Sequence, residues 1–519
     1  MRHTLSVLLL AAMASAPVIA QNSPSKPCPS NPGLGNSSAK PSWNGWGAGL
    51  TNARFQDAAG AQLAPDQVTR LKLKWAFGFP GAKSVYGQPT VVAGRVFVGV
   101  DTGAVYSIDA GSGCSYWSFQ AADGVRSAVS IGPGRTTGEY LAYFGDLKGN
   151  VYALNAATGE QVWKTQADTH PGARITGATQ LYQNRLYVPV ASDEEVRAVD
   201  AAYQCCTFRG SVLALDTLTG RQVWKTYVIP EAPKATAKNA KGTQQFGPSG
   251  GGVWNSPTLD PKRHALYVGT GDAYTAPAPK TTDAILALDM DSGKVLWSAQ
   301  DLAGDAWVVS CIEGRGSSEN CPKDAGPDFD FGSSPMLRTM PNGKNLLIAG
   351  QKSGIIWAHD PDRKGAVAWK TSVASKKPAP QGQVNFGGSA DDKNAYFGLD
   401  SGGIVALSLT NGERLWFTDI QPEGGRHGGQ DAAVSTIPGV LFSGGWDGVL
   451  RALSTSDGKI LWTFDMLRDF DTVNGVPAKG GSMGSSGPTV AGGMVFAGAG
   501  YPGVQNGRNG NVLLAFAVE

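Results

Sequence analysis

The stretch GSVLALDTLTGRQVW, residues 210–224, contains the pattern that decides the fold. A short apolar strand runs into Asp216 and a Thr-Gly turn, and a second strand then ends in Trp224. Alternating apolar residues on both sides of a glycine-containing turn are typical of a β-hairpin. The sequence therefore predicts a hairpin over residues 210–224.

The same pattern recurs along the chain and ends in a Trp each time. Clear copies end at Trp163, Trp297, Trp416 and Trp462, and weaker copies end at Trp117 and Trp369. Another hairpin with a Gly-rich end precedes each copy, as in GQPTVVAGRVFVGVDTG, residues 87–103. An array of four-stranded units is the signature of a β-propeller.

The two ends of the chain complete the last unit. LKLKWAF, residues 71–77, supplies Trp75 with no strands before it, and GNVLLAFAVE, residues 510–519, ends one strand short of its Trp. Joined, they make one blade. We therefore predict an all-β fold, an eight-bladed β-propeller over residues 21–519 closed by pairing of the N- and C-terminal strands. The Trp residues are expected to pack between blades.

Composition narrows the function. The chain has 519 residues, with 44 Lys and Arg against 42 Asp and Glu, a net charge of +2. So small a basic excess argues against a protein that binds nucleic acid electrostatically, and the chain is not of disordered composition. No later segment reaches the 18 apolar residues of a membrane span.

The first twenty residues have the pattern of a secretory signal peptide. Arg2 and His3 precede an apolar run, and small residues before Gln21 form a cleavage site. We therefore expect residues 1–20 to be removed and the mature protein to be periplasmic or secreted. The six Cys can form disulfides in that compartment.

Two stretches interrupt the repeat. Residues 231–250 are rich in Lys, Ala and Gly and are expected to form a mobile loop between blades 3 and 4. Residues 301–327 form an insertion that holds Cys311 and Cys321, which we expect to form a local, structural disulfide.

Cys205 and Cys206 are adjacent in the sequence. They are expected to form a strained vicinal disulfide, of the kind that is labile or functional. The alternative pairs them separately with Cys28 and Cys114.

Propeller topology decides which residues can meet. Residues that open the first strand of each blade, and residues that follow its second strand, converge on one face of the central channel. The first group contains Arg126, Arg174, Thr176, Trp254, Asp328, Asp330 and Asn385. The second contains Glu194, Glu195, Cys205, Cys206, Asp272, Gln351 and Lys352. Taken singly, each has an ordinary structural alternative as a turn cap, a solvated loop charge, an ion-pair partner or a core residue.

Together these residues indicate a binding site for a cation and an anionic organic molecule. Converging carboxylates repel one another unless a cation lies among them or their pKa values rise. A hard cation such as Ca²⁺ takes oxygen ligands and fits Glu194, Asp272 and Asp328. The nearby cations suit an anionic cofactor, to which Trp254 offers an aromatic platform.

At these residues the sequence resembles the pyrroloquinoline quinone (PQQ)-dependent alcohol dehydrogenases, which are eight-bladed propellers. The resemblance spans nearly all of residues 43–519, from WNGWGAGLTNARF onward. YQCCTFRGSVLALD, CPKDAGPDFDFGSSP and VNGVPAKGGSMG are similar to the polyvinyl alcohol dehydrogenase branch. These strings are long and specific, whereas the Trp repeat alone is not.

The resemblance implies a role for each position. Trp254 would lie flat under PQQ, Asp328 would be the catalytic Asp, and Lys352 would lie beside the quinone oxygens. Further cofactor contacts would come from Arg126, Arg174, Thr176, Asn385, Cys205 and Cys206. The metal ligands would be Glu194, Asp272, Asp328 and Asp330, with Glu195 as the alternative to Glu194.

The sequence departs from the family pattern in three places. Asp272 stands where the family has an Asn ligand. The methanol-type enzymes carry their vicinal Cys pair just before the Arg126 position, where this chain has Ala121 and Ala122, so contact between the blade 3 pair and PQQ is in question. Asp330 adds a carboxylate, which resembles the lanthanide-using enzymes and makes a lanthanide an alternative to Ca²⁺.

The resemblance predicts a periplasmic enzyme that oxidises secondary alcohols, polymeric ones included, to ketones. Because no Cys-x-x-Cys-His occurs in the sequence, we expect no haem in this chain and a separate electron acceptor such as a periplasmic cytochrome c. Two alternatives remain. One is a non-enzymatic propeller scaffold of the outer-membrane assembly type, and the other is a PQQ-dependent sugar or aldehyde dehydrogenase.

Overall fold

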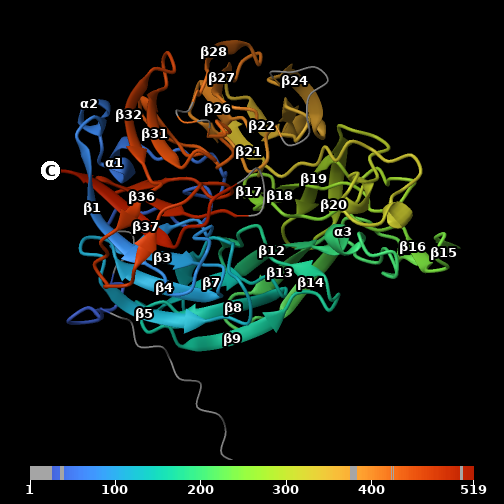
Figure 1. Ribbon diagram of the computed structural model, residues 1–519, viewed down its shortest axis with the longest axis horizontal. Helices are drawn as coiled ribbons and strands as arrows, with labels where there is room; N and C mark the ends of the chain where they lie inside the picture. Colours follow the sequence, from blue (N-terminus) through green and yellow to red (C-terminus); the bar gives the residue numbers. More distant parts are fainter. Residues whose placement is uncertain (1–25, 36–39, 375–382, 422–423, 425, 503–506) are drawn as a thin grey trace, which may run out of the picture.

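Each predicted repeat folds into an antiparallel sheet, and the sheets stand side by side in a ring (Figure 1). The computed structural model describes residues 26–35, 40–374, 383–421, 424, 426–502 and 507–519. The predicted signal peptide lies outside the described residues. The prediction of an eight-bladed β-propeller is confirmed.

The first four blades follow the chain in order. Blade 1 contains β2 (Thr90–Val92), β3 (Arg95–Gly99), β4 (Ala104–Asp109) and β5 (Ser115–Gln120). Blade 2 contains β6 (Ser130–Pro133), β7 (Tyr140–Gly145), β8 (Asn150–Asn155) and β9 (Gln161–Gln166). Blade 3 contains β10 (Ala173–Arg174), β11 (Gln180–Tyr182), β12 (Arg185–Ser192), β13 (Ser211–Asp216) and β14 (Gln222–Tyr227). Blade 4 contains β17 (Thr258–Asp260), β18 (Ala265–Gly269), β19 (Ala284–Asp289) and β20 (Val295–Gln300).

The remaining blades continue in the same way. Blade 5 contains β21 (Met336–Thr339), β22 (Asn345–Gly350), β23 (Ile355–Asp360) and β24 (Ala366–Ser372). Blade 6 contains β25 (Ser389–Ala390), β26 (Asn394–Gly398), β27 (Ile404–Ser408) and β28 (Arg414–Thr418). Blade 7 contains β29 (Ser435–Ile437), β30 (Val440–Ser443), β31 (Val449–Ser454) and β32 (Ile460–Asp465).

Blade 8 is built from both ends of the chain, as predicted. It contains β35 (Thr489–Ala491), β36 (Met494–Ala499), β37 (Val512–Val518) and β1 (Leu71–Gly78). Strand β1 pairs antiparallel with β37, from Leu71 opposite Val518 to Gly78 opposite Val512. The hydrogen bonds between these two strands close the ring.

The Trp–Gly pattern of the repeat joins one blade to the next. Trp163 in β9 donates its indole N–H to the carbonyl of Thr217 in blade 3, at 2.8 Å. Gly220, in the turn of blade 3, lies against the Trp163 ring so closely that a Cβ there would be 2.7 Å from it. The same indole bond links Trp75 to Ala110, Trp117 to Ala156, Trp224 to Met290, Trp369 to Leu409, Trp416 to Thr455 and Trp462 to Leu71. The expectation that these Trp residues pack between blades is therefore confirmed.

Residues 43–56, which we call the inner segment, bond to the first strand of every blade in chain order. The partners, from blade 1 to blade 8, are Trp43 with Val91, Asn44 with Ile131, Gly49 with Gln180, Leu50 with Leu259, Thr51 with Leu337, Ala53 with Ala390, Arg54 with Thr436 and Gln56 with Val490. Arg54 is 1% exposed, and its guanidinium donates to the carbonyls of Trp46 and Val434 and to Ser435 Oγ. The inner segment thus ties the blades together around the central axis.

Several short helices and a short hairpin lie outside the blade sheets. The helices are α1 (Ala58–Ala61), α2 (Pro65–Val68) and α3 (Glu194–Arg197), with 3-10 turns η2 (Val309–Cys311), η3 (Ser318–Asn320) and η4 (Pro361–Arg363). Strands β33 (Asp469–Phe470) and β34 (Ala478–Lys479) form a small hairpin. No helix among the described residues is long and apolar enough to cross a membrane.

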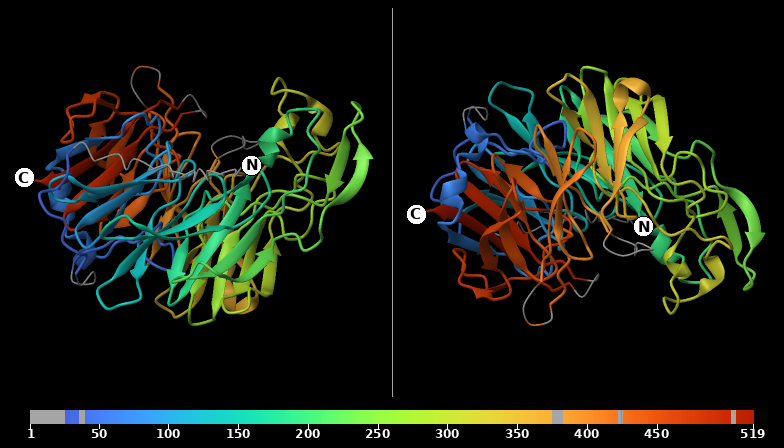
Figure 2. Two further views of the ribbon diagram at one scale, coloured as in Figure 1. Left: turned by 90° about the horizontal axis from the view of Figure 1, so that it is seen from below. Right: turned by 90° about the horizontal axis from the view of Figure 1, so that it is seen from above.

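The stretch expected to be a loop, residues 231–250, contains a second hairpin instead. Its strands are β15 (Lys234–Lys238) and β16 (Gln244–Gly247), and it projects from the edge of the ring (Figures 1 and 2). The two strands contain five polar or charged side chains, which hid the apolar alternation by which strands are recognised in sequence. The register comes from the backbone pairing of Lys234 with Gly247.

The disulfides follow the first of the predicted alternatives. Cys205 pairs with Cys206, Cys28 with Cys114, and Cys311 with Cys321. The last bridge closes the insertion between blades 4 and 5, as expected.

Candidate active site

A cavity of about 420 Å³ opens on the face where the first strands begin and the second strands end. Residues of the two converging groups line it, as the topology predicted: Arg126, Arg174, Thr176, Glu195, Trp254, Asp272, Asp328, Asp330, Lys352 and Asn385. Glu194, Cys205, Cys206 and Gln351 do not.

Three carboxylates meet at one side of this cavity. One oxygen from each of Asp272, Asp328 and Asp330 lies within 4.8 Å of the other two, and the three residues are 2%, 6% and 4% exposed. Burial, together with the neighbouring negative charges, raises the pKa of Asp272 well above its usual value. Burial likewise raises the pKa of Asp328, although Lys352 opposes the shift.

Lys352 neutralises part of this charge. Its Nζ lies 2.6 Å from Asp328 Oδ1 and 3.1 Å from Asp330 Oδ2. Burial alone would lower the pKa of Lys352, but Asp328 and Asp330 outweigh it and raise that pKa well above its usual value. Lys352 therefore stays protonated and positively charged.

Trp254 lies beside the same cluster. Its indole N–H donates to Asp330 Oδ2 at 3.0 Å, and Lys352 Nζ is 5.4 Å from its ring centroid. Phe386 meets the ring edge to face, with centroids 6.0 Å apart. The orientation of the indole plane is thus held by a hydrogen bond on one side and an aromatic contact on another.

The insertion of residues 301–327 also contributes a side chain that holds the backbone at Asp328. Asp305, which is buried, accepts the backbone N–H of Asp328 at 3.3 Å and that of Phe329 at 2.8 Å. Asp328 has a φ of 59°, a left-handed conformation that costs energy for a residue with a side chain. The two hydrogen bonds that Asp305 accepts stabilise that conformation and so fix the direction of the Asp328 carboxylate.

The two glutamates expected as alternative metal ligands occupy different places. Both glutamates lie on α3, but Glu194 is completely buried and does not line the cavity, whereas Glu195 lines it. Backbone N–H groups of Thr207 and Phe208 donate to the Glu194 carboxylate at 2.8 Å each and hold it there. Burial raises the pKa of Glu195 to about 7, with Lys352 opposing the shift and Asp330 adding to it.

The vicinal disulfide does not line the cavity, and its expected contact with a cofactor stays a prediction. Cys205 and Cys206 are buried in an apolar cluster with Phe208, Tyr274 and Val308. Apolar surface of this kind is more favourable inside the protein than at a wet cavity wall. Sequence showed which loop holds the pair but not that it turns inward.

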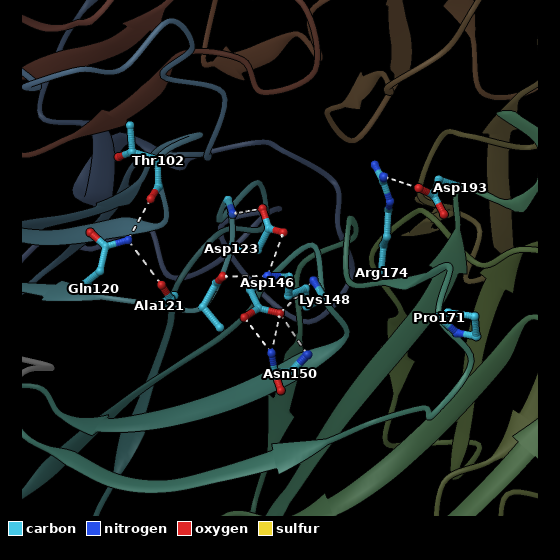
Figure 3. Close-up of polar contacts among 12 residues, drawn as sticks. Thr102, Gln120, Ala121, Asp123, Asp146, Lys148, Asn150, Pro171, Arg174 and Asp193 are labelled. Carbon is cyan, nitrogen blue, oxygen red and sulfur yellow. Dashed lines mark hydrogen bonds and ion pairs between the residues drawn. The ribbon is translucent and has the colours of Figure 1, made fainter. Parts of the chain in front are cut away.

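Two arginines, Arg126 and Arg174, form the cationic side of the cavity. Arg174 points toward Asp193 and forms an ion pair with it (Figure 3). The Arg126 guanidinium lies 5.1 Å from the centroid of Phe386 and 5.6 Å from that of Tyr501. Thr176 and Asn385 line the wall between them, and Asn385 donates to Asp431 Oδ1 at 2.8 Å.

The further lining residues that the sequence analysis missed include four from blades 6 to 8: Phe386, Asp431, Trp446 and Tyr501. All four obey the positional rule that found the others. Phe386 and Asp431 precede the first strands of blades 6 and 7, and Trp446 and Tyr501 follow the second strands of blades 7 and 8. The positional rule therefore also holds for blades 6, 7 and 8.

The residues present fit a bound cation and a flat anionic molecule. Among the described residues, Asp272 Oδ2 and Asp330 Oδ1 are buried and accept no hydrogen bond. Buried oxygens without donors are costly unless a cation takes their lone pairs. The Trp254 ring and the Arg126 guanidinium offer an aromatic surface and a positive charge to an aromatic carboxylate.

Comparison with known proteins assigns this propeller to a class of oxidoreductases. The family described as glucose/ethanol/alcohol dehydrogenase, β-propeller domain, which takes PQQ, matches residues 43–309. The outer membrane protein assembly factor BamB family matches residues 209–437 and 400–518, in the blade repeat. The chain belongs to the PQQ-dependent alcohol dehydrogenase family.

Within that family the chain is similar to polyvinyl alcohol dehydrogenases. It is 41% identical to the enzyme of Pseudomonas sp, over 92% of this chain and 77% of that protein. It is 38% identical to the enzyme of Sphingopyxis sp. (strain 113P3), over 97% of this chain and 80% of that protein. The crystal structure of quinohemoprotein alcohol dehydrogenase from Comamonas testosteroni shares the fold, with a TM-score of 0.67, 18% identity and coverage of 93% and 81%.

Proposed function

We propose that this protein oxidises secondary alcohols, polyvinyl alcohol or a related compound, to ketones with PQQ and a metal ion. The observation that carries the proposal is the buried cluster of Asp272, Asp328 and Asp330, with Lys352 paired to it, beside Trp254. The proposed substrate rests on the similarity to polyvinyl alcohol dehydrogenases.

The metal would be held by Asp272, Asp328, Asp330 and Glu195, which replaces Glu194 in this role. Ca²⁺ is the first candidate because it takes six to eight oxygen ligands in flexible geometry. A lanthanide is the second, since Asp330 adds a carboxylate to the cluster.

PQQ would lie on Trp254. Arg126 and Arg174 would bind its carboxylates, and Thr176 and Asn385 would contact it from the wall of the cavity. When bound, PQQ supplies a quinone that accepts a hydride from the alcohol carbon.

The protein supplies the base and the charges around it. Asp328 accepts the proton of the substrate hydroxyl as the general base. Asp328 would be ionised and ready to accept a proton with a cation among the carboxylates, because the positive charge would lower the pKa of Asp328 toward its usual value. Lys352 keeps that carboxylate in place. The hydride and the proton together account for the oxidation of one alcohol to one ketone.

We further propose that the enzyme works in the periplasm and passes its electrons to a separate acceptor such as a cytochrome c. The signal-peptide pattern of residues 1–20 supports export, and the absence of Cys-x-x-Cys-His from the sequence supports an external acceptor.

The decisive experiment is dye-linked dehydrogenase activity of the purified protein with added PQQ and either Ca²⁺ or La³⁺. Polyvinyl alcohol, 2-propanol, ethanol and glucose are compared as substrates. PQQ-dependent oxidation of the secondary alcohols supports the proposal, and preference for glucose favours a sugar dehydrogenase instead. A protein that binds no PQQ would be a scaffold propeller.

A further inference from the structure

Helix α3 is one turn long and carries two consecutive glutamates that face in different directions. Glu195 lines the cavity, whereas Glu194 is completely buried on the other side of the turn. A helix of four residues is not stable by itself, because one turn forms too few hydrogen bonds to offset its ordering. Its orientation must therefore be fixed by contacts outside the helix.

The Glu194 carboxylate supplies those contacts through one loop. Tyr203 donates its hydroxyl to Oε1 at 3.0 Å, and the backbone N–H of Thr207 donates to the same oxygen at 2.8 Å. The backbone N–H of Phe208 donates to Oε2 at 2.8 Å. His170 Nε2 lies 3.5 Å from Oε1. Both carboxylate oxygens are therefore used, and bonds to a charged acceptor are the strong kind.

The loop that donates these bonds is itself anchored. The Cys205–Cys206 disulfide lies between Tyr203 and Thr207 and is buried. Phe246 of β16 donates its backbone N–H to the carbonyl of Cys205 at 2.7 Å. Glu194 thus links α3 to a cross-linked, buried segment.

We propose that Glu194 is a positioning residue that sets the place of Glu195 in the metal site, an inference that rests on the function proposed above. Because the two residues are neighbours on a single turn, any rotation of α3 that released Glu194 would turn Glu195 away from Asp272 and Asp330. Removal of partners that orient metal ligands weakens metal binding by about 10- to 100-fold.

The test is calorimetric titration of the cofactor-free full-length protein with Ca²⁺, which needs no turnover. Glu194→Gln should weaken Ca²⁺ binding about tenfold, because its amide cannot accept from both backbone donors. Since this change also removes a charge, Tyr203→Phe is the decisive variant. It removes only one donor, leaves the charge unchanged, and should weaken binding about threefold.

Two further variants complete the design. Glu139→Gln is the matched control, because Glu139 also accepts backbone N–H groups, from Arg135 and Thr136, in an exposed turn of blade 2. Its Ca²⁺ affinity should equal that of the wild type. Glu195→Gln removes the ligand itself and should weaken binding more than either test variant.

The outcomes separate the two proposals. If Glu195→Gln loses affinity while Glu194→Gln and Tyr203→Phe keep it, the positioning role is overturned and the metal site stands. If Glu195→Gln binds Ca²⁺ as the wild type does, or the wild type binds none, the metal site and the positioning role both fail. If Glu194→Gln does not fold, Tyr203→Phe decides alone.

Discussion

The ammonium nitrogen of Lys352 lies 2.6 Å from Oδ1 of Asp328, and both side chains line the cavity. The pair comes from two connections of blade 5, one before its first strand and one after its second. Lys352 holds the carboxylate without neutralising it by proton transfer, because its pKa is raised. The arrangement keeps a base in a fixed place.

Replacing Asp328 by Asn should therefore remove turnover while PQQ remains bound. The amide keeps the size of the side chain but cannot accept a proton, and loss of a general base lowers kcat by about 10²- to 10⁴-fold. Dye-linked activity and PQQ absorbance of the same preparation measure the two properties. Full activity in Asp328→Asn would remove the assignment of the base.

Asp305→Asn should lower kcat by about tenfold through Asp328, because the amide cannot accept both backbone N–H groups that the carboxylate now accepts. PQQ binding should change little. Asp324→Asn is the control, since Asp324 is exposed in the same insertion. Equal kcat in the two variants would contradict the role given to Asp305.

Metal binding should strengthen as pH rises. Burial raises the pKa of Glu195 to about 7 from about 4.3 in the unfolded chain, so the folded protein without metal holds a proton that the unfolded chain has lost. This contribution to stability is complete below pH 4 and is lost as pH rises through about 7. The Tm of the metal-free protein should accordingly fall between pH 5 and 8, and Ca²⁺ should restore it most at pH 8. Glu195→Gln should flatten both trends. A Ca²⁺ affinity independent of pH would refute this account.

Gly220→Ala should destabilise the contact between blades 2 and 3. Gly220 has a φ of 68°, and an added Cβ would meet the Trp163 ring at 2.7 Å. The control is Gly242→Ala, where φ is 83° but the space is open. Both variants bear the backbone cost of about 1–2 kcal/mol, and Gly220→Ala should lose about 1–3 kcal/mol more through overpacking. Denaturant unfolding measures the difference, and equal losses would argue against close packing on Trp163.

Arg54→Ala should cost about 3 kcal/mol or more, because several buried acceptors would lose a charged donor at once. Arg70→Ala, at an exposed position just before β1, should change the free energy of unfolding by less than about 0.5 kcal/mol. If the two variants unfold alike, the inner segment contributes little to the ring.

The architecture could be predicted because each copy of the repeat contains the residues that pack one blade against the next. Trp163 and Gly220 belong to different blades, yet each copy of the pattern contains both kinds of residue, so the pattern encodes the contact between neighbouring blades. The propeller topology then sufficed to predict that Asp272, Asp328 and Lys352 lie together, although the sequence does not show in which direction their side chains point.

What the sequence could not show was direction within a turn. Glu194 and Glu195 are adjacent and chemically equal, and only the donors of residues 203–208 decide which one is buried. The inward turn of Cys205 and Cys206 has the same origin. Asp305 was hidden because its partners, 23 and 24 residues away along the chain, meet it only in the folded insertion.

The inner segment has a consequence for how the chain is made. Residues 43–56 precede every blade in the sequence and meet the blades in the order of their synthesis, from Val91 to Val490. Domains made on the ribosome generally form from the N-terminus onward. The segment that contacts the first strand of every blade is therefore synthesised before any of those strands, and it is available to each blade as that blade emerges. The ring can close only after β37 has been synthesised, because β1 pairs with β37.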